Sequence, residues 1–421
     1  MRCARGLAVL ILVVGSVPAV ADPRPPAPAE PSRALGLALQ LDLRLRHEAV
    51  DDPRWVEPAR AQTARGSLQG RLALPAGVEA VVTGEWIRRL GPARFDDGLP
   101  GAPGMPLVAD PPAEELDEAY LAWHAHAGAA EWTAWAGRRG WGQANLRFLS
   151  GGPAWRHNRQ SHDGLGLQWQ QATLELEGFH LETTHRPLGN RSPRGVQDLD
   201  GEGLRLRWTP ATSPYAEAYA QQLRFAEGGP IPASFSHRLT GLRLGARQSL
   251  AIGQLGIELD QARQDPLAVG GLAAGDYQRL ALSLQSGRWT VSLEREQLGG
   301  DGRRSLQTPL AALHAFQGHA DVFLRTPPDG LIDQALGLSF GDARLGLELR
   351  YHRFEADRGG ARYGHEWDAA VTARLPAGQR LLLKAADYRS AAAGNDPPLR
   401  PDQGDVRKLW LQWEATWSLV R

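Results

Sequence analysis

The segment from Leu35 to Leu45 has a leucine at every odd position and glycine, alanine or a polar residue at every even one. Successive side chains of a β-strand point to opposite faces, so one face of this segment is aliphatic and the other is small, polar or charged. A strand on a soluble core can have this pattern. A strand of a transmembrane barrel must have it, because lipid lies on one side and a wet lumen on the other.

The same two-residue period recurs along the chain. It is the period of strands and not of helices. The alternating segments lie at 67–74, 204–208, 242–245, 255–260, 280–284, 289–294, 345–352, 367–373 and 409–419. No window later than the first residues holds a charge-free apolar run long enough for a membrane-spanning helix, which excludes a helical membrane protein.

The connections expected between these strands alternate in length. Tight turns are expected at 75–77, 127–129, 210–214, 251–253, 286–287, 341–342 and 376–378. Long segments rich in Gly, Pro and Asp lie at 91–113, 140–160, 186–200, 226–236, 264–276 and 299–332. Short periplasmic turns that alternate with long extracellular loops are typical of outer-membrane barrels.

We therefore expect an all-β fold, a transmembrane antiparallel β-barrel of about 18 strands, with a range of about 16–18. That number leaves about 22 residues for each strand and its loop, which suits strands of about 10 residues. An even number places both termini on the periplasmic side. The Leu35–Leu45 strand is then expected to pair with Leu409–Leu419 and close the sheet.

Tryptophan is abundant, with 14 residues. Aromatic girdles at the two membrane interfaces explain why many of them fall in or at the ends of expected strands. These are Trp86, Trp123, Trp132, Trp135, Trp208, Trp289, Trp367, Trp413 and Trp417.

The N-terminus has the features of a secretory signal peptide over residues 1–21. Arg2 and Arg5 are basic, an apolar run follows, and Ala19-Val20-Ala21 fits a small-residue cleavage site. The apolar run is too short to serve as an uncleaved membrane anchor. The Pro-rich residues 22–33 are expected to form a leader, and residues 34–421 the barrel. Cys3 is the only cysteine, so the mature chain is expected to have no disulfide and no thiolate metal site.

The composition, 42% hydrophobic and 22% charged, is compatible with a barrel because lumen-facing residues alternate with lipid-facing ones. The 47 basic and 47 acidic residues give no argument for a nucleic-acid partner. Lys384 and Lys408 are the only lysines, and all other cationic side chains are arginines. Codon bias in a GC-rich genome is an alternative explanation of this arginine excess.

Several stretches carry information beyond the strand period. They are 108–121, 137–163, 307–331, 363–368 and 408–411, and together they resemble the alginate-export family of outer-membrane porins. The 307–331 stretch is the most specific, because it is long and no packing rule dictates it. Two positions depart from the family's pattern: Arg139 replaces a glutamine and His319 a tryptophan. The resemblance implies a porin for a uronic-acid polymer that works with a periplasmic export apparatus.

Strand phase and the family motif together suggest residues that line the pore or bind a solute. Rings of arginine in a pore favour anions, and the guanidinium fork matches a carboxylate. The candidates on strands are Arg44, Arg46, Arg71, Arg205, Arg207, Arg243, Arg344 and Arg350. The same strand faces carry acidic residues, so an alternative is an internal lattice of ion pairs that stiffens the wall.

The 140–160 segment adds further candidates from the family motif. They are Arg138, Arg147, Arg156 and Asp163. If this loop folds into the lumen, they form a constriction; otherwise they anchor the loop on the wall. The segment Gln307–Leu331 is a second candidate for a loop folded inward, because His314, Phe316 and Phe323 make it too apolar for a solvated tip.

We expect no catalysis and no cofactor. Gly337–Gly341 fits the nucleophile-elbow pattern, but another strand is expected after it instead of a helix. His124 and His126 share a strand face without an identifiable third metal ligand.

The expected function is passive passage of solutes across the outer membrane of a Gram-negative bacterium, with anionic or uronate-type sugars as the favoured class. The expected partners are outer-membrane lipid, the outer-membrane assembly machinery, a periplasmic export apparatus, and an anionic saccharide or other small solute. The alternatives are a general diffusion porin without sugar preference and, less favoured, an outer-membrane barrel enzyme. A secreted soluble β-protein would need polar residues on the outer strand faces, where leucine and tryptophan stand instead.

Overall fold

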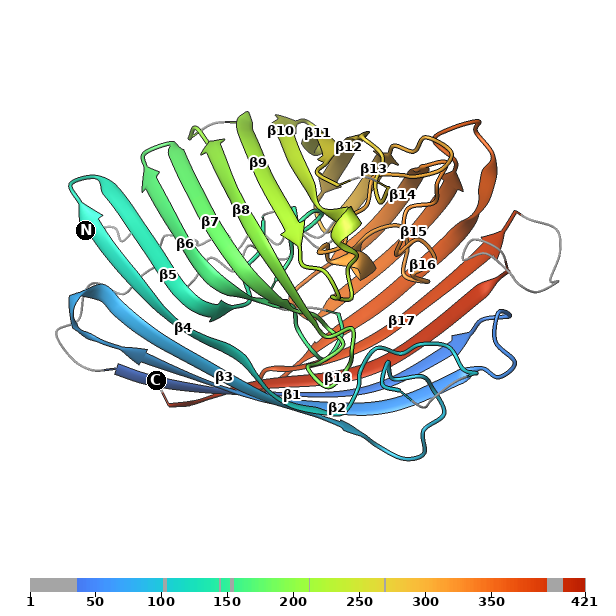
Figure 1. Ribbon diagram of the computed structural model, residues 1–421, viewed down its shortest axis with the longest axis horizontal. Helices are drawn as coiled ribbons and strands as arrows, with labels where there is room; N and C mark the ends of the chain where they lie inside the picture. Colours follow the sequence, from blue (N-terminus) through green and yellow to red (C-terminus); the bar gives the residue numbers. More distant parts are fainter. Residues whose placement is uncertain are drawn as a thin grey trace.

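The computed structural model describes residues 36–100, 104–143, 145–151, 155–211, 213–268, 270–391 and 404–420. The signal peptide and the leader expected from the sequence lie outside the described residues. The described chain forms one closed, 18-stranded antiparallel barrel (Figure 1). The expected fold class is thereby confirmed.

Each strand pairs with the strands before and after it in sequence, and β1 also pairs with β18. The strands are β1 Gly36–Asp51, β2 Ala59–Ala73, β3 Val78–Arg89, β4 Ala113–Ala127, β5 Ala130–Arg139, β6 Ser161–Gln171, β7 Leu174–His185, β8 Val196–Trp208, β9 Tyr215–Phe225, β10 His237–Leu250, β11 Gly253–Pro266, β12 Gly275–Ser286, β13 Trp289–Leu298, β14 Leu331–Gly341, β15 Leu345–Glu355, β16 Arg362–Leu375, β17 Gln379–Ser390 and β18 Val406–Val420. Three short 3-10 helices, η1 Pro75–Gly77, η2 Ala233–Phe235 and η3 Leu313–Ala315, lie in the connections.

The seam of the barrel lies between β1 and β18, as the leucine stripe predicted. In this pairing Leu41 faces Trp417 and Leu45 faces Trp413. The tight turns all lie at the end of the barrel where β1 begins and β18 ends, and the long connections lie at the other end. One tight turn, at 172–173 between β6 and β7, was not predicted from the sequence.

The turn after β2 shows why these connections need glycine. Gly77 has φ +75°, and a Cβ there would lie 2.1 Å from the carbonyl oxygen of His124 on β4. A left-handed backbone and this close approach both exclude larger residues.

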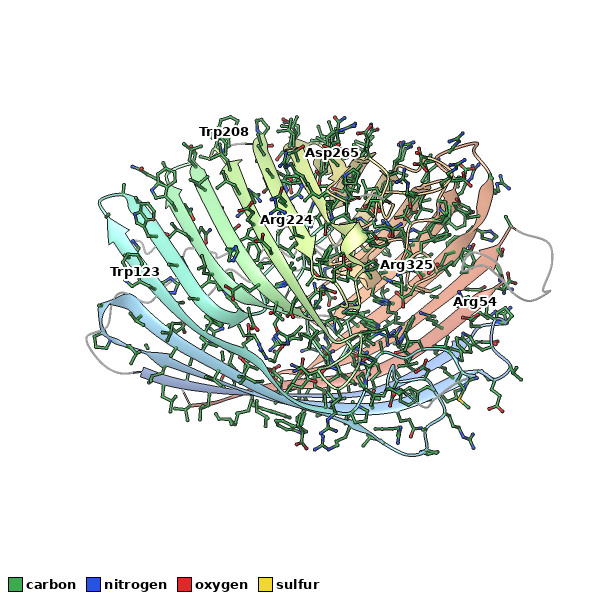
Figure 2. The ribbon with its side chains drawn as sticks, viewed as in Figure 1. Arg54, Trp123, Trp208, Arg224, Asp265 and Arg325 are labelled. Carbon is green, nitrogen blue, oxygen red and sulfur yellow. The ribbon has the colours of Figure 1, made fainter. Side chains whose placement is uncertain are left out.

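The outer face of the strands is apolar. Leucines that alternate along the strands stay exposed on the isolated chain, as at Leu121 and Leu204. Trp123 and Trp208, labelled in Figure 2, point outward near the tight-turn end. Trp135 was expected in the same girdle, but it is buried on the inner face, where its ring lies 6.1 Å from that of Trp141.

Two long connections, the described residues of 140–160 and the segment 299–330, pack inside the ring of strands (Figure 1). Phe148 and Phe323 from these connections share one hydrophobic cluster with wall residues such as Tyr277 and Tyr388. Leu149 and Leu310 join a second cluster with other wall residues. Among the described residues, no helix is long and apolar enough to cross a membrane.

Candidate functional site

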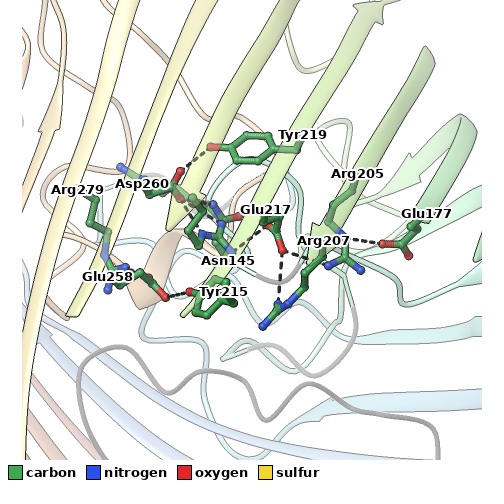
Figure 3. Close-up of polar contacts among 12 residues, drawn as sticks. Asn145, Glu177, Arg205, Arg207, Tyr215, Glu217, Tyr219, Glu258, Asp260 and Arg279 are labelled. Atoms are coloured by element: carbon green, nitrogen blue, oxygen red, sulfur yellow. Dashed lines mark hydrogen bonds and ion pairs between the residues drawn. The ribbon is translucent and has the colours of Figure 1, made fainter. Parts of the chain in front are cut away.

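A belt of alternating arginines and carboxylates crosses the inner face of the wall from β7 to β15; Figure 3 shows its central part. Side chains that face each other on neighbouring strands lie about 5 Å apart, so each guanidinium can reach carboxylates on both sides. We call this set the charge belt. Its members are Glu177, Arg205, Glu217, Arg243, Asp260, Glu258, Arg279, Glu294 and Arg350.

The first half of the charge belt is built around two arginines. Arg205 on β8 lies 2.9 Å from Glu177 on β7 and 3.1 Å from Glu217 on β9. Arg243 on β10 lies 3.1 Å from both Glu217 and Asp260. Arg243 is buried, so its charge depends on these two partners for the interactions that water would otherwise supply.

The second half begins at β11, which contributes both Asp260 and Glu258, and reaches β15 without a member on β14. Arg279 on β12 contacts Glu258 and lies 2.7 Å from Glu294 on β13. Arg350 on β15 lies 2.8 Å from the other carboxylate oxygen of Glu294. The charge belt therefore joins strands through side chains as well as backbone, which matches the ion-pair lattice that the sequence left open.

The 140–160 loop is fixed to this wall by buried polar contacts. The guanidinium of Arg147 lies 2.9 Å from Glu296, the next inward residue after Glu294 on β13, and the side chain is 2% exposed. Asn145 donates to Asp260 of the charge belt at 3.0 Å. Arg147 also lies over the ring of Phe316, 4.5 Å from its centroid, so the same side chain touches the second loop.

The two infolded loops also bond to each other. The backbone N–H of Ser150 donates to the carbonyl of Leu310 at 2.9 Å, and the N–H of Ala312 donates to the carbonyl of Leu146 at 2.9 Å. The loops therefore form one layer inside the barrel. The expectation that both 140–160 and 307–331 fold inward agrees with this arrangement.

A group of aromatic and charged side chains lies where three connections meet the wall of β1, β17 and β18. We call it the loop junction. It consists of Asp110, Trp155, Arg156, His314 and Asp321 from the connections and Arg46, Lys384 and Lys408 from the strands.

Trp155 is the centre of the loop junction. The guanidinium carbon of Arg46 and the ammonium nitrogen of Lys384 each lie 4.3 Å from the centroid of its ring, and the ring of His314 stacks on it at 4.5 Å. Cations over an indole ring are held by the ring's quadrupole. The arrangement places positive charge around one aromatic side chain in the lumen.

Carboxylates balance these cations. Asp110 lies 3.0 Å from Arg46, and Asp321 lies 2.7 Å from Lys408. Burial alone would raise the pKa of Asp110, but His157, Arg46 and Arg156 together hold that pKa well below its usual range. Asp110 is therefore ionised, and it ties the 90–112 connection to the junction.

Four arginines on the inner face have side chains that stay partly exposed. Arg71 and Arg380 have side chains 32% and 48% exposed. Their carboxylate contacts are long or shared: Arg71 lies 3.4 Å from Glu79, and Arg44 and Arg380 both contact Glu414. We call this set the exposed arginines: Arg44, Arg71, Arg207 and Arg380.

Most of the site residues expected from the sequence lie inside the barrel. The strand residues that face inward are Arg44, Arg46, Arg71, Arg205, Arg207, Arg243 and Arg350, and the loop residues are Arg147 and Arg156. Among the described residues, no group of three or more histidine, cysteine or acidic side chains is placed to hold a metal ion.

Three of the expected residues lie elsewhere. Arg138 on β5 is opposite Asp163 on β6, and both share the outward face of Leu165, so they form an external ion pair at 2.7 Å. Arg344 lies exposed in the tight turn between β14 and β15 instead of on the wall. These three residues therefore do not line the lumen.

The inner face also carries residues that were not predicted from the sequence: Arg65, Arg279, Arg380 and both lysines. Arg279 could have been found, because it alternates with Leu280 and Leu282. The rarity of lysine is itself a sequence signal: the chain has two lysines, and both lie in the loop junction. Asp110 lies in a connection, where no strand alternation indicates which side chains point inward.

Comparisons with known proteins show the fold. No family model matches the chain and no curated protein matches it, so the resemblance to the alginate-export family finds no support there. Solved structures with the same fold include Pseudomonas aeruginosa OccK9 (OpdG), at 16% identity and TM-score 0.67, covering 91% of this chain and 98% of that one. Acinetobacter baumannii OccAB4 matches at 12% identity and TM-score 0.67, covering 93% and 100%. The outer membrane protein opdK from Pseudomonas aeruginosa matches at 14% and 0.65, covering 91% and 98%.

Proposed function

We propose that this protein is a passive channel for small hydrophilic solutes in the outer membrane of a Gram-negative bacterium. The observation that carries the proposal is the contrast between the two faces of one closed wall. The outward face is leucine- and tryptophan-rich around the barrel, and the inner face is charged and crossed by infolded loops. A bilayer outside and water inside account for both faces. The similarity to opdK, an outer membrane protein, supports the location.

Single-channel recording in a planar bilayer tests this proposal. The purified chain is expected to give discrete conductance steps, and the same preparation unfolded by heat is expected to give none. Folding of each sample is checked by its heat-dependent mobility on a gel. A folded sample that inserts without producing steps would contradict a channel.

We further propose a preference for anionic solutes, carried by the exposed arginines. Partly exposed ion pairs are worth only about 0–1 kcal/mol, so a carboxylate of a passing solute can compete with the wall for Arg71 or Arg207. A guanidinium binds a carboxylate through two parallel hydrogen bonds. Uronate-type sugars fit this chemistry, and the family motif in the sequence is what suggests them.

The reversal potential in a salt gradient tests the anionic preference. Wild type is expected to favour chloride over potassium, and Arg71→Gln with Arg207→Gln is expected to shift the ratio towards potassium. Arg344→Gln serves as the matched control, because Arg344 lies in an exposed turn away from the inner face. Equal ratios in wild type and the double variant, or no block by oligouronates, would leave a general diffusion porin as the better description.

We also propose that the protein catalyses no reaction. Ser339, the serine of the elbow-like pattern, lies within β14, and β15 follows it after a tight turn. A nucleophile elbow needs a helix at that point. The assembly machinery and a periplasmic export apparatus stay predictions from the sequence.

A further inference from the structure

A row of polar and basic side chains runs across the outward face of five neighbouring strands, β13 to β17. Cross-strand register places its members directly side by side. We call it the basic row: Arg295, Gln334, Arg353, His365 and Arg389. All five side chains are exposed or half-exposed on the outside of the barrel.

The basic row borders the apolar band on the side of the long loops. One step towards the tight turns, β13 to β16 present Leu293, Leu336, Tyr351 and Trp367 in a second row, and β17 presents Asp387. The rings of Tyr351 and Trp367 lie 4.9 Å apart. Tyrosine and tryptophan favour the level of lipid headgroups, where one end of the ring is apolar and the other is wet. The basic row therefore lies at or just beyond headgroup level.

The basic row contains no carboxylate. Within the described residues Arg295 forms no ion pair. Arg353 contacts Glu355 on its own strand, and Arg389 lies 2.8 Å from Asp405. These exposed pairs are weak and leave the arginines able to change partners. The row itself therefore holds three arginines and no carboxylate, and the carboxylates of Glu355, Asp387 and Asp405 lie beside it.

The corresponding outward row on β7 to β10 differs. There the register places His180, Glu202, Gln222 and Arg238 side by side, with Arg224 paired to Asp200 next to them. This row contains one carboxylate, Glu202, and one arginine, Arg238. Of these two rows, the one on β13 to β17 is the one whose arginines have no carboxylate among the members of the row itself.

We propose that the basic row binds the phosphate groups of a phosphorylated glycolipid in the outer leaflet. Arginine binds phosphate through its planar fork of donors. Neighbouring strands lie about 4.8 Å apart, so Arg295 and Arg353, two strands apart, can hold one headgroup from both sides. Sugar rings would rest on Tyr351 and Trp367, and acyl chains along Leu293 and Leu336. This inference depends on the proposed outer-membrane location.

Native mass spectrometry of the full detergent-folded chain, titrated with bisphosphorylated lipid A, tests the inference. Each basic residue at an anionic lipid surface contributes a factor of about 5 in affinity, so Arg295→Gln with Arg353→Gln is expected to weaken binding about 25-fold. Arg224→Gln with Arg238→Gln, which removes two arginines from β9 and β10, is the matched control and is expected to stay within about twofold of wild type.

Two further arms identify the ligand chemistry. The affinity of dephosphorylated lipid A for wild type is expected to be no higher than its affinity for the Arg295→Gln, Arg353→Gln double variant. Inorganic phosphate at the lipid concentration is expected not to displace lipid A. The inference would be overturned if wild type and the double variant bound lipid A with equal affinity, or if wild type bound lipid A equally well with and without its phosphates. Displacement of lipid A by inorganic phosphate would also overturn it. Conductance of the double variant is expected to match wild type, which separates failure here from failure of the channel proposal.

Discussion

At the scale of single residues, Arg147 connects the infolded 140–160 loop to the wall and to the second loop. It is buried, its guanidinium lies 2.9 Å from Glu296, and Glu296 also accepts from the hydroxyl of Tyr277 at 2.9 Å. Replacing Arg147 by methionine would leave the carboxylate of Glu296 buried without its cation, which costs about 3–5 kcal/mol. We expect Arg147→Met to release the loop, seen as faster limited proteolysis within 140–160 and as a noisier channel current.

The matched control removes both charges. Arg147→Met with Glu296→Gln leaves no uncompensated charge, because the amide can still accept from Tyr277. This double variant is expected to recover most of the protease resistance of wild type. If the double variant is as sensitive as the single one, hydrophobic packing of the loop, and not the ion pair, holds it in place.

Residue orientation could be predicted from the sequence where leucines marked the phase of a strand. Arg44, Arg205 and Arg350 were assigned correctly to the inner face for that reason. On β5 the alternating positions are mostly alanine and tryptophan, so neither face stands out. Arg138, expected beside the infolded loop, lies on the outward face of that strand, and Trp135, expected in the girdle, lies on the inner face.

At the scale of elements, the 299–330 loop is held against β16 to β18 by buried titratable groups. The Nδ1–H of His314 donates to Asp321 at 2.7 Å and its Nε2 accepts from Lys384 at 2.8 Å, while the N–H of Ala320 donates to Glu366 at 2.7 Å. Burial lowers the pKa of His314 to about 3, with Asp321 opposing the shift and Lys384 adding to it. The docked loop therefore keeps His314 neutral.

This loop is expected to loosen in acid. A released loop would bind a proton at His314 with a pKa near 6.5, so docking is fully favoured above that pH and weakens as the pH falls towards 3. The equilibrium should move towards release by about tenfold for each pH unit over this range. Hydrogen exchange of residues 313–323, corrected for the intrinsic rate, measures it.

The pH dependence has its own control. In His314→Gln with His319→Gln the titrating groups are absent, so the corrected exchange of 313–323 is expected to change much less between pH 7 and pH 5. His319 belongs in this variant because burial, with Lys384 and His314, lowers its pKa as well. An equally steep profile in wild type and variant would show that other groups govern docking.

The strands were predictable as elements, whereas the interior arrangement of the loops was only partly so. Alternation and turn residues are local signals, and they gave the strand number and the β1–β18 seam. The contact between Ser150 and Leu310 joins residues far apart in sequence and has no local signal. The apolar character of Phe316 and Phe323 indicated that the second loop packs inward, but not what it packs against.

At the scale of the whole molecule, the apolar band determines how the barrel would lie in a bilayer. On β14 the outward side chains from the tight turn upward are Phe340, Leu338, Leu336 and then Gln334. Leu338 lies inside the band and Gln334 just beyond it. An arginine on the lipid face costs about 2–4 kcal/mol at the bilayer midplane and about 0–1 near the interface. We expect Leu338→Arg to lower the free energy of unfolding in lipid vesicles by about 2–4 kcal/mol.

Gln334→Arg is the matched variant on the same strand and face, and it is expected to change that free energy by less than about 1 kcal/mol. The comparison separates depth in the membrane from the general effect of adding a charge. In detergent micelles, which adapt their shape to the protein, the difference between the two variants should shrink. If the outward face from Leu336 to Phe340 is immersed in the bilayer, the cost of an arginine depends on its height along β14. Equal destabilisation of both variants in vesicles would therefore contradict this position of the barrel in the membrane.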